Sequence, residues 1–174
     1  MYKKVFALLF LVSSFQLLIA QTSLLKNFPE GYTPDEIGRR IAYRFVTEKH
    51  ALHAGKWIGY PETFYWNGSL KYAAAAKDKA LIKLLQARFE HLFTTEKALL
   101  PIKNHVDLNM FGSLPLELYW VTKDERYKEL GLPYADTQWE VPADAKPEEK
   151  EWAEKGYSWQ TRLWIDDMYM ITIV

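Results

Sequence analysis

Apolar and polar residues alternate with helical spacing along most of the chain after residue 33. Thr33 and Pro34, followed by two acidic residues, form a typical helix start in which Thr33 is the N-cap and Pro34 the first helical residue. Apolar residues then recur at intervals of three and four positions, at Ile37, Ile41, Phe45 and Val46. The spacing predicts an amphipathic helix over this segment.

Two helical hairpins of similar layout are predicted next. In the first, a helix over residues 69–76 contains four consecutive alanines, Lys77 and Asp78 form a turn, and an amphipathic helix follows over residues 80–93. In the second, residues 105–119 form one helix, residues 122–125 the turn, and a new helix begins at Arg126.

The two hairpins share short sequences at corresponding places. Gly-Ser-Leu occurs at residues 68–70 and again at residues 112–114, and Lys-Asp occurs in both turns. A repeat of roughly forty residues built from helix pairs is typical of α-solenoids and of closed α/α toroids. With no convincing alternating strand in the sequence, the prediction is an all-α fold.

An insertion separates these hairpins from the start of a third unit. Prolines punctuate residues 138–156, and residues 147–156 read as a short helix with acidic residues first and glycine at its end. The third unit begins at Trp159, and the sequence stops before its turn. We therefore expect about two and a half units, the N-terminal part of a longer helical array.

The first twenty residues have the pattern of a secretory signal peptide. Lys3 and Lys4 precede an apolar run that ends before Gln21. The alternative is a membrane anchor, but polar Ser13, Ser14 and Gln16 interrupt the run and leave it too short for a span. The expected mature chain covers residues 21–174, has no membrane span, and is secreted or periplasmic.

Composition excludes several classes of function. The chain has no cysteine, which excludes disulfides, a thiol nucleophile and a cysteine-based metal site. Its formal net charge is zero, so nothing favours nucleic acid as a partner. His50 and His53 have a spacing that suits a metal, but no third ligand follows, and ordinary histidines are the better interpretation.

Chemistry is expected where each unit starts its first helix, because the inner helices of an α/α barrel converge at one end. Aromatic and polar residues gather at these starts: Tyr65, Trp66 and Asn67; His105, Asp107 and Asn109; Trp164, Asp166 and Asp167. Two carboxylates, Asp107 and Asp166, are the minimum for acid/base chemistry on a sugar. Trp164 and Tyr169 flank the aspartate pair as expected for a sugar site.

Each candidate also has a structural interpretation. Asp107 could be a helix N-cap, and Asp167 is better explained as a partner of Arg162 or of a backbone donor. Trp66 and Trp164 could belong to the core, as aromatic residues at helical spacing usually do. Asp166 remains the best catalytic candidate, although a structural hydrogen bond would also explain it.

Three motifs together resemble a known enzyme group: residues 107–119, residues 122–127, and the Trp-Ile-Asp-Asp-Met-Tyr-Met element at 164–170. They are similar to the N-terminal half of the unsaturated glucuronyl and rhamnogalacturonyl hydrolases, glycoside hydrolase families 88 and 105. The resemblance implies part of an (α/α)6 barrel that removes a 4,5-unsaturated uronic acid from oligosaccharides made by polysaccharide lyases. The last motif is its most specific part.

The resemblance also implies roles for single residues. Asp166 corresponds to the general acid/base, Asp107 to the second acid, and Tyr65 and Trp164 to the aromatic wall around the sugar. Asp166 would protonate C4 of the vinyl ether and then assist the addition of water at C5, without a metal or organic cofactor. The later hairpins of the family have no counterpart in this sequence, so a truncated chain is expected.

Two other functions remain open from the sequence. The chain could be a non-catalytic helical module that binds carbohydrate or protein, or a different sugar enzyme with an α/α barrel. Whether a dimer could complete the barrel is also left open.

Overall fold

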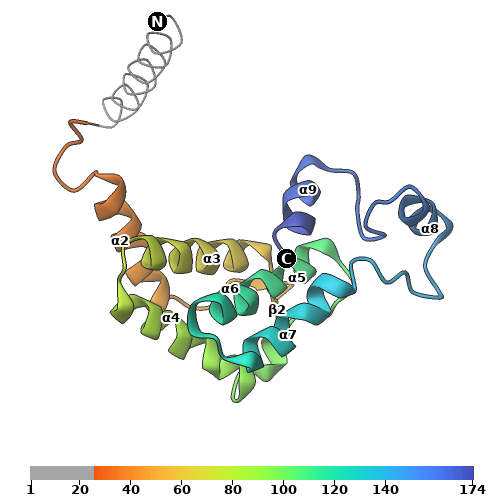
Figure 1. Cartoon of the computed structure of the whole chain (residues 1–174), viewed down its shortest axis with the longest axis horizontal. Coiled ribbons are helices and arrows are strands. Elements are labelled where there is room, and N and C mark those ends of the chain that lie inside the picture. The colour runs from red at the N-terminus through yellow and green to blue at the C-terminus, as the bar shows by residue number, and fades with distance from the viewer. Residues whose placement is uncertain (1–25) are drawn as a thin grey trace, which may run out of the picture. The chain divides into compact units, whose positions relative to one another are not determined.

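The computed structural model describes residues 26–174, and these residues are mostly helical (Figure 1). The signal peptide expected at residues 1–20 lies outside the described residues. Residues up to Ile37 belong to one unit and Gly38–Val174 to a second. The helices and strands are α2 (Pro34–Thr47), β1 (Leu52–His53), β2 (Trp57–Ile58), α3 (Tyr60–Ala75), α4 (Lys79–Glu90), α5 (Val106–Asn109), α6 (Ser113–Thr122), α7 (Glu125–Asp136), α8 (Pro147–Glu154) and α9 (Ile165–Thr172).

The first described helix, α2, starts as the sequence predicts. The backbone N–H of Glu36 donates to the Thr33 hydroxyl at 3.2 Å, and the Glu36 carboxylate accepts from the Thr33 backbone N–H at 3.0 Å. This reciprocal arrangement is a capping box, which satisfies amide groups that the first helical turn leaves unpaired. The expected N-cap is confirmed.

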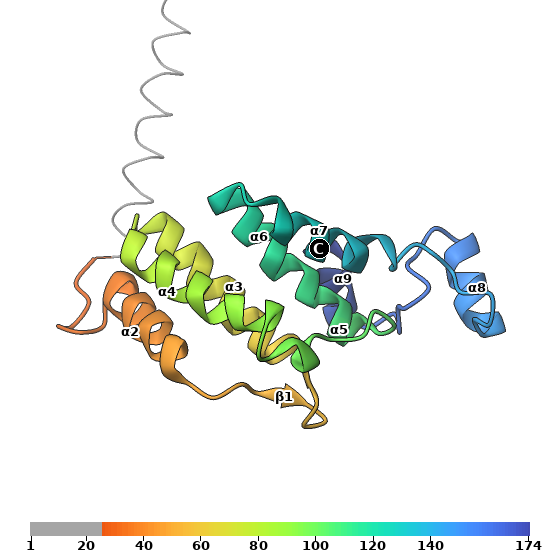
Figure 2. The ribbon, with the colours of Figure 1, turned by 90° about the horizontal axis from the view of Figure 1, so that it is seen from below.

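Two helical hairpins, α3–α4 and α6–α7, form the body of the second unit, and α3 also packs on α6 (Figures 1 and 2). The two turns have the same construction. Lys77 and Lys123 both adopt a left-handed backbone, and Asp78 and Asp124 each cap the helix that follows by accepting a backbone N–H. The shared Lys-Asp pair is therefore a structural repeat, as predicted.

The boundaries of two predicted helices are wrong. α3 begins at Tyr60 rather than Ser69, because Pro61 is well suited to a first helical turn and Gly68 fits the helix interior. The helix predicted over residues 105–119 is divided into α5, a 3-10 turn at Met110–Gly112, and α6. Pro115 contributes to this division, since it has no N–H to donate to the carbonyl four residues earlier.

The remaining segments are short. β1 and β2 pair as a two-stranded antiparallel ribbon, with Leu52 opposite Ile58, and no larger sheet occurs in residues 26–174. The predicted helix in the insertion is present as α8, which both ribbon views place on a loop beyond the hairpins (Figures 1 and 2). α9 packs against α5, which joins the end of the chain to the second hairpin.

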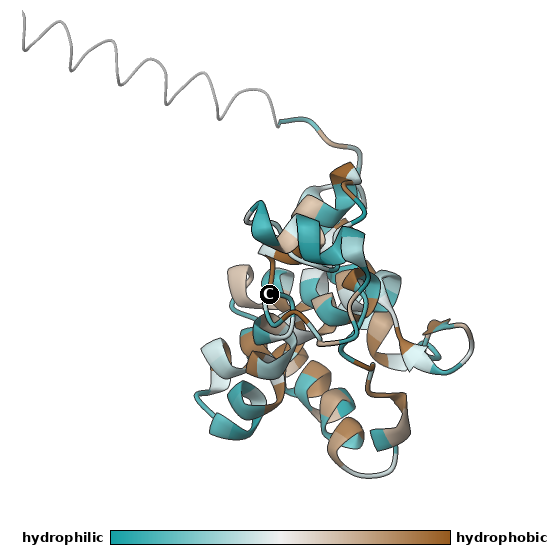
Figure 3. Cartoon of the chain, turned by 90° about the vertical axis from the view of Figure 1, so that its right-hand side faces the viewer, coloured by the Kyte–Doolittle hydropathy of each residue, from teal (hydrophilic) through white to brown (hydrophobic). Residues whose placement is uncertain are grey.

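Aromatic side chains fill much of the core. Phe89 lies at the centre, with its ring 5.4 Å from Trp66, 5.9 Å from Phe111 and 5.6 Å from Tyr127, and all four side chains are fully buried. Hydrophobic and hydrophilic residues alternate along the helices (Figure 3). The high aromatic content of the sequence thus serves packing between the two hairpins as well as the surface.

The repeated Gly-Ser-Leu sequence has different roles in the two hairpins. A Cβ atom on Gly112 would lie 2.5 Å from the Cβ of Tyr134 and 3.0 Å from the Gly131 carbonyl oxygen. A Cβ atom on Gly68 would have nothing within 4 Å. Only the second glycine is required for close packing, here between the start of α6 and α7.

Candidate functional site

A cluster of one arginine and two aspartates joins α5 to the segment that leads into α9. The Arg162 guanidinium donates to Asp107 at 2.9 Å and to Asp167 at 2.5 Å. The backbone N–H of Arg162 also donates to Asp167, at 2.6 Å. The structure thus brings together two of the predicted site residues, Asp107 and Asp167, from distant parts of the sequence.

Asp107 enters this cluster from the first turn of α5. The N-cap of α5 is His105, whose Nδ1 accepts the backbone N–H of Asp107 at 3.2 Å. The alternative in which Asp107 is itself the N-cap is therefore wrong, because α5 starts at Val106, two residues earlier than that role requires. The Asp107 carboxylate instead points to Arg162, with the His105 ring 3.7 Å away.

Asp166 and Asp167 have opposite environments. Successive residues of a helix are rotated by about 100°, so one side chain of an adjacent pair faces inward while the other faces outward. Asp167 is fully buried and Asp166 is exposed. Asp166 is therefore a surface carboxyl and is not enclosed in an apolar setting. The partnership of Asp167 with Arg162 is confirmed.

The buried carboxyl of Asp167 is held in its charged form. Burial alone raises the pKa of Asp167, but hydrogen bonds from the guanidinium and backbone N–H of Arg162 outweigh burial and leave this pKa below its ordinary value. The same contacts raise the pKa of Arg162. The exposed carboxyl of Asp166 thus lies next to a buried carboxylate, Asp167, whose negative charge is balanced by Arg162.

The two predicted aromatic flanks of the aspartate pair also diverge. Trp164 is 58% exposed, and the Arg162 guanidinium lies over its ring, 4.3 Å from the centroid. The Tyr169 ring instead stacks on Phe64 of α3, with 5.2 Å between the ring centroids. Trp164 is therefore the tryptophan available at the surface of this cluster, and Tyr169 connects α9 to the first hairpin.

A groove of about 730 Å³ lies along the other side of α9. Aromatic and aliphatic side chains dominate its lining, including Trp139, Tyr157, Leu163, Met168 and Tyr169. Neither Asp107 nor Asp167 lines this groove. Its lining includes Ile165, the first residue of α9, and does not include Asp166.

The other predicted site residues lie away from the cluster. Trp66 is fully buried in the core, which agrees with its structural interpretation, and Asn67 is buried on α3. The Tyr65 hydroxyl donates to the Ile41 carbonyl at 3.0 Å. Asn109 is fully buried, and its amide donates to the Tyr134 carbonyl at 3.1 Å, which ties α5 to α7. These four residues do not converge on Asp107 in the described part of the chain.

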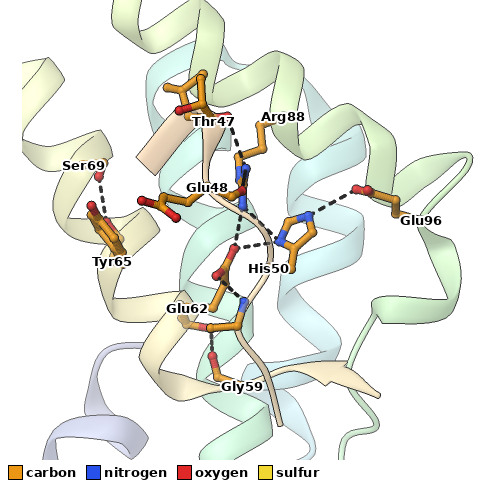
Figure 4. A network of polar contacts seen from close by, with 12 residues as sticks. Thr47, Glu48, His50, Gly59, Glu62, Tyr65, Ser69, Arg88 and Glu96 are labelled. Carbon is orange, nitrogen blue, oxygen red and sulfur yellow. Dashed lines mark hydrogen bonds and ion pairs between the residues drawn. The ribbon is translucent and has the colours of Figure 1, made fainter. Parts of the chain in front are cut away.

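A second charged cluster lies in the first hairpin (Figure 4). Buried Glu62 accepts hydrogen bonds from Arg88 at 3.0 Å, from the backbone N–H of Ala51 at 3.0 Å, and contacts the His50 ring at 2.7 Å. Arg88 also donates to the carbonyls of Val46 and Glu48. This cluster fixes the segment between α2 and β1 to α3 and α4. His50 thus has a structural partner, and His53 is exposed.

Arg162 is the site residue that the sequence analysis did not connect to Asp107. The signal was available, because two candidate carboxylates that converge in a fold need a counter-charge. What the sequence did not provide was the contact between residues 55 positions apart.

The described residues contain neither a cluster of metal-ligating side chains nor a helix that could span a membrane. Among residues 26–174, no group of three or more histidine and acidic side chains is arranged to hold a metal ion. Within the same residues, no helix has the length and apolar character to cross a membrane.

Comparison with known proteins gives one match. The family model for Glycosyl Hydrolase Family 88 matches residues 35–174, which include both hairpins, Asp107, Arg162 and the aspartate pair. No curated protein and no solved structure matches the chain.

Proposed function

The chain belongs to glycoside hydrolase family 88, and from this premise we propose that it removes a 4,5-unsaturated uronic acid from oligosaccharides generated by polysaccharide lyases. The observation that carries the proposal is the meeting of Asp107 with the start of α9. It brings one carboxylate of α5 to a helix whose first turn presents an exposed carboxyl, Asp166, beside an exposed ring, Trp164. These are groups that acid/base chemistry on a sugar requires.

The proposed reaction adds water across the double bond of the sugar. Asp166 gives its proton to C4 of the vinyl ether, which leaves a positive charge shared by C5 and the ring oxygen. Water then adds at C5 and returns a proton to Asp166, giving a hemiketal. The bond between C5 and the ring oxygen then breaks, so that C5 becomes a ketone and the proton of its hydroxyl passes to the ring oxygen. The hemiacetal left at C1 collapses to an aldehyde, and the next sugar leaves as an alcohol with that proton. One water is consumed, and Asp166 is regenerated.

The other residues have supporting roles in this proposal. Asp107 is the second acid of the site and shares one guanidinium nitrogen of Arg162 with Asp167. Trp164 offers a broad apolar face on which a sugar ring can stack. No metal or organic cofactor enters the reaction.

The test is turnover of a lyase-generated unsaturated disaccharide by the whole chain. Loss of the ultraviolet absorbance of the conjugated double bond reports the reaction directly. We expect Asp166→Asn to lower kcat by about 10²–10⁴-fold, the usual contribution of a general acid/base. Asp144→Asn is the matched control, since Asp144 is an exposed aspartate in the insertion. Equal rates in the two variants would contradict the role of Asp166.

A second candidate function is carbohydrate binding without catalysis. The groove beside α9 favours it, because Trp139, Tyr157 and Tyr169 are each about half exposed there. In this case the same disaccharide, or its saturated counterpart, would bind without loss of absorbance. Turnover of saturated sugars would instead indicate a different glycoside hydrolase activity.

We also propose that the protein acts outside the cytoplasm, in the periplasm or as a secreted protein. The support is the charged and apolar pattern of residues 1–20. Expression of the full chain in a bacterial host, followed by N-terminal sequencing of the periplasmic fraction, tests this. A start at or near Gln21 is expected, and an intact N-terminus in the cytoplasm would contradict it.

A further inference from the structure

Arg162 occupies an unusual place between the two helices that carry the candidate acids. Its guanidinium contacts carboxylates on both α5 and α9, and its side chain remains 26% exposed. The Asp107 side chain is 12% exposed and the Asp167 side chain is fully buried. The arginine is therefore the most exposed of the three charged side chains, and part of its guanidinium side chain remains in contact with solvent.

The donors of Arg162 are already used by protein groups. Nε donates to Asp167 at 3.1 Å, one terminal nitrogen donates to both aspartates, and the other lies 3.4 Å from Asp107. The flat face of the guanidinium covers the Trp164 ring. Little donor capacity is left for a substrate carboxylate, so Arg162 acts on the site through its neighbours.

Those neighbours bracket Asp166. Asp167 is the next residue along α9, Trp164 is two residues before Asp166, and both contact Arg162 directly. Asp107 is fixed to the same guanidinium from α5. Within residues 26–174, Arg162 is the side chain that forms ion pairs with both helices at this point. It therefore links the first turn of α9 to Asp107.

We infer that Arg162 is a positioning residue that sets the place of Asp166 and Trp164 relative to Asp107. The inference rests on the proposed function, in which these three residues touch the sugar. Geometry has a large effect on such reactions, because a displacement of about 1 Å can lower a rate by about 10²-fold. Loss of Arg162 therefore affects kcat more than substrate binding.

The experiment compares Arg162→Met, Arg162→Lys and Arg126→Met in the whole chain. Arg126 is the matched control. It also forms ion pairs with two carboxylates, Glu90 and Asp124, but it lies on α7 and contacts none of the candidate site residues named above. We expect Arg162→Met to lower kcat by about 10²-fold with a small change in KM. Arg126→Met should retain the parent kcat and KM.

Rescue distinguishes positioning from a general effect on stability. Arg162→Lys restores one charge without the planar fork that reaches both aspartates, so we expect it to recover only part of kcat. Added guanidinium ion at concentrations that leave the protein folded should raise the kcat of Arg162→Ala and not that of Arg126→Ala. Unchanged kcat in Arg162→Met, or a loss without rescue by either route, would overturn the inference.

If the parent chain turns over no unsaturated sugar, the proposed function is wrong but the inference about Arg162 is still untested by kinetics. A second measurement then decides the inference. Amide hydrogen exchange then reports whether the first turn of α9, which carries Asp166, is held as firmly without the Arg162 side chain. Faster exchange there in Arg162→Met, with unchanged exchange in α4, supports the inference. Equal exchange of the α9 turn in Arg162→Met and the parent chain would overturn it.

Discussion

Two arginines in this chain bind carboxylates and lie over tryptophan rings, yet their surroundings differ. Arg88 pairs with Glu62 and lies 5.3 Å from the Trp66 ring, which is fully buried. Arg162 pairs with Asp107 and Asp167 and lies over Trp164, which is 58% exposed. The same combination of charges and rings occurs once inside the core and once at the surface.

The difference shows that a buried ion pair is not by itself a sign of function. A terminal nitrogen of Arg88 also donates to backbone carbonyls of the segment after α2, so the contacts of this cluster hold the fold together. The Arg162 cluster leaves a ring and a carboxyl, Trp164 and Asp166, facing solvent. A site requires such accessible groups, and Trp164 and Asp166 provide them in the second cluster.

The largest expected difference between the clusters is the loss of stability when the tryptophan of each is replaced by alanine. Trp66→Ala removes a fully buried ring and leaves a cavity, so we expect it to lower the free energy of unfolding by about 3–5 kcal/mol. Trp164→Ala should change it by less than about 0.5 kcal/mol, as for most surface substitutions, while weakening binding of the sugar. Denaturant unfolding and ligand titration measure both effects. Similar losses of stability would remove the distinction between core and surface cluster.

Substitution of the arginine should also destabilise the protein more in the Arg88 cluster than in the Arg162 cluster. Arg88→Met leaves the Glu62 carboxylate buried without its arginine partner, and we expect a loss of roughly 3 kcal/mol in the free energy of unfolding. Arg162→Met should lose less, about 1 kcal/mol, because the Arg162 side chain is 26% exposed and the backbone N–H of residue 162 still donates to Asp167.

The double variant Glu62→Gln with Arg88→Met is the control for this pair, since it removes the unpaired charge. It should be more stable than Arg88→Met alone. A larger loss for Arg162→Met than for Arg88→Met would contradict the comparison.

Low pH should reduce the stability that both clusters contribute. We expect this effect to be smaller than the effects of the tryptophan and arginine substitutions. Burial raises the pKa of Glu62, but hydrogen bonds from His50, Ala51 and Arg88 outweigh it, so the pKa is lowered, as it is at Asp167. A lowered pKa in the folded state means that each carboxylate adds stability above its ordinary pKa and loses it as pH falls through the folded value.

We therefore expect the free energy of unfolding to fall as pH is lowered below the ordinary values of 4.5 for Glu62 and 3.8 for Asp167. Glu62→Gln and Asp167→Asn should each flatten this dependence in denaturant titrations across the acid range. The change should be larger for Glu62→Gln, because its cluster is the more enclosed. An unchanged slope in both variants would contradict the assignment of charged carboxylates to these positions.

The sequence alone determined the helical class, the family resemblance and the repeated turns. Periodicity and local capping are carried by neighbouring residues, which is why the capping box at Thr33 and the Lys-Asp turns could be predicted. The family match over residues 35–174 agrees with the motifs that carry the resemblance. The roles assigned to Asp166 and Asp107 stay predictions.

The tertiary structure decided which candidates meet. Tyr65, Trp66, Asn67 and Asn109 share the local pattern of the site residues, but packing turns them toward α2, the core and α7. The adjacent aspartates look equivalent in sequence, and only the direction of α9 against α5 buries Asp167 and exposes Asp166. The contact between Arg162 and Asp107 arises for the same reason, since burial and long-range ion pairs depend on how helices pack rather than on neighbours along the chain.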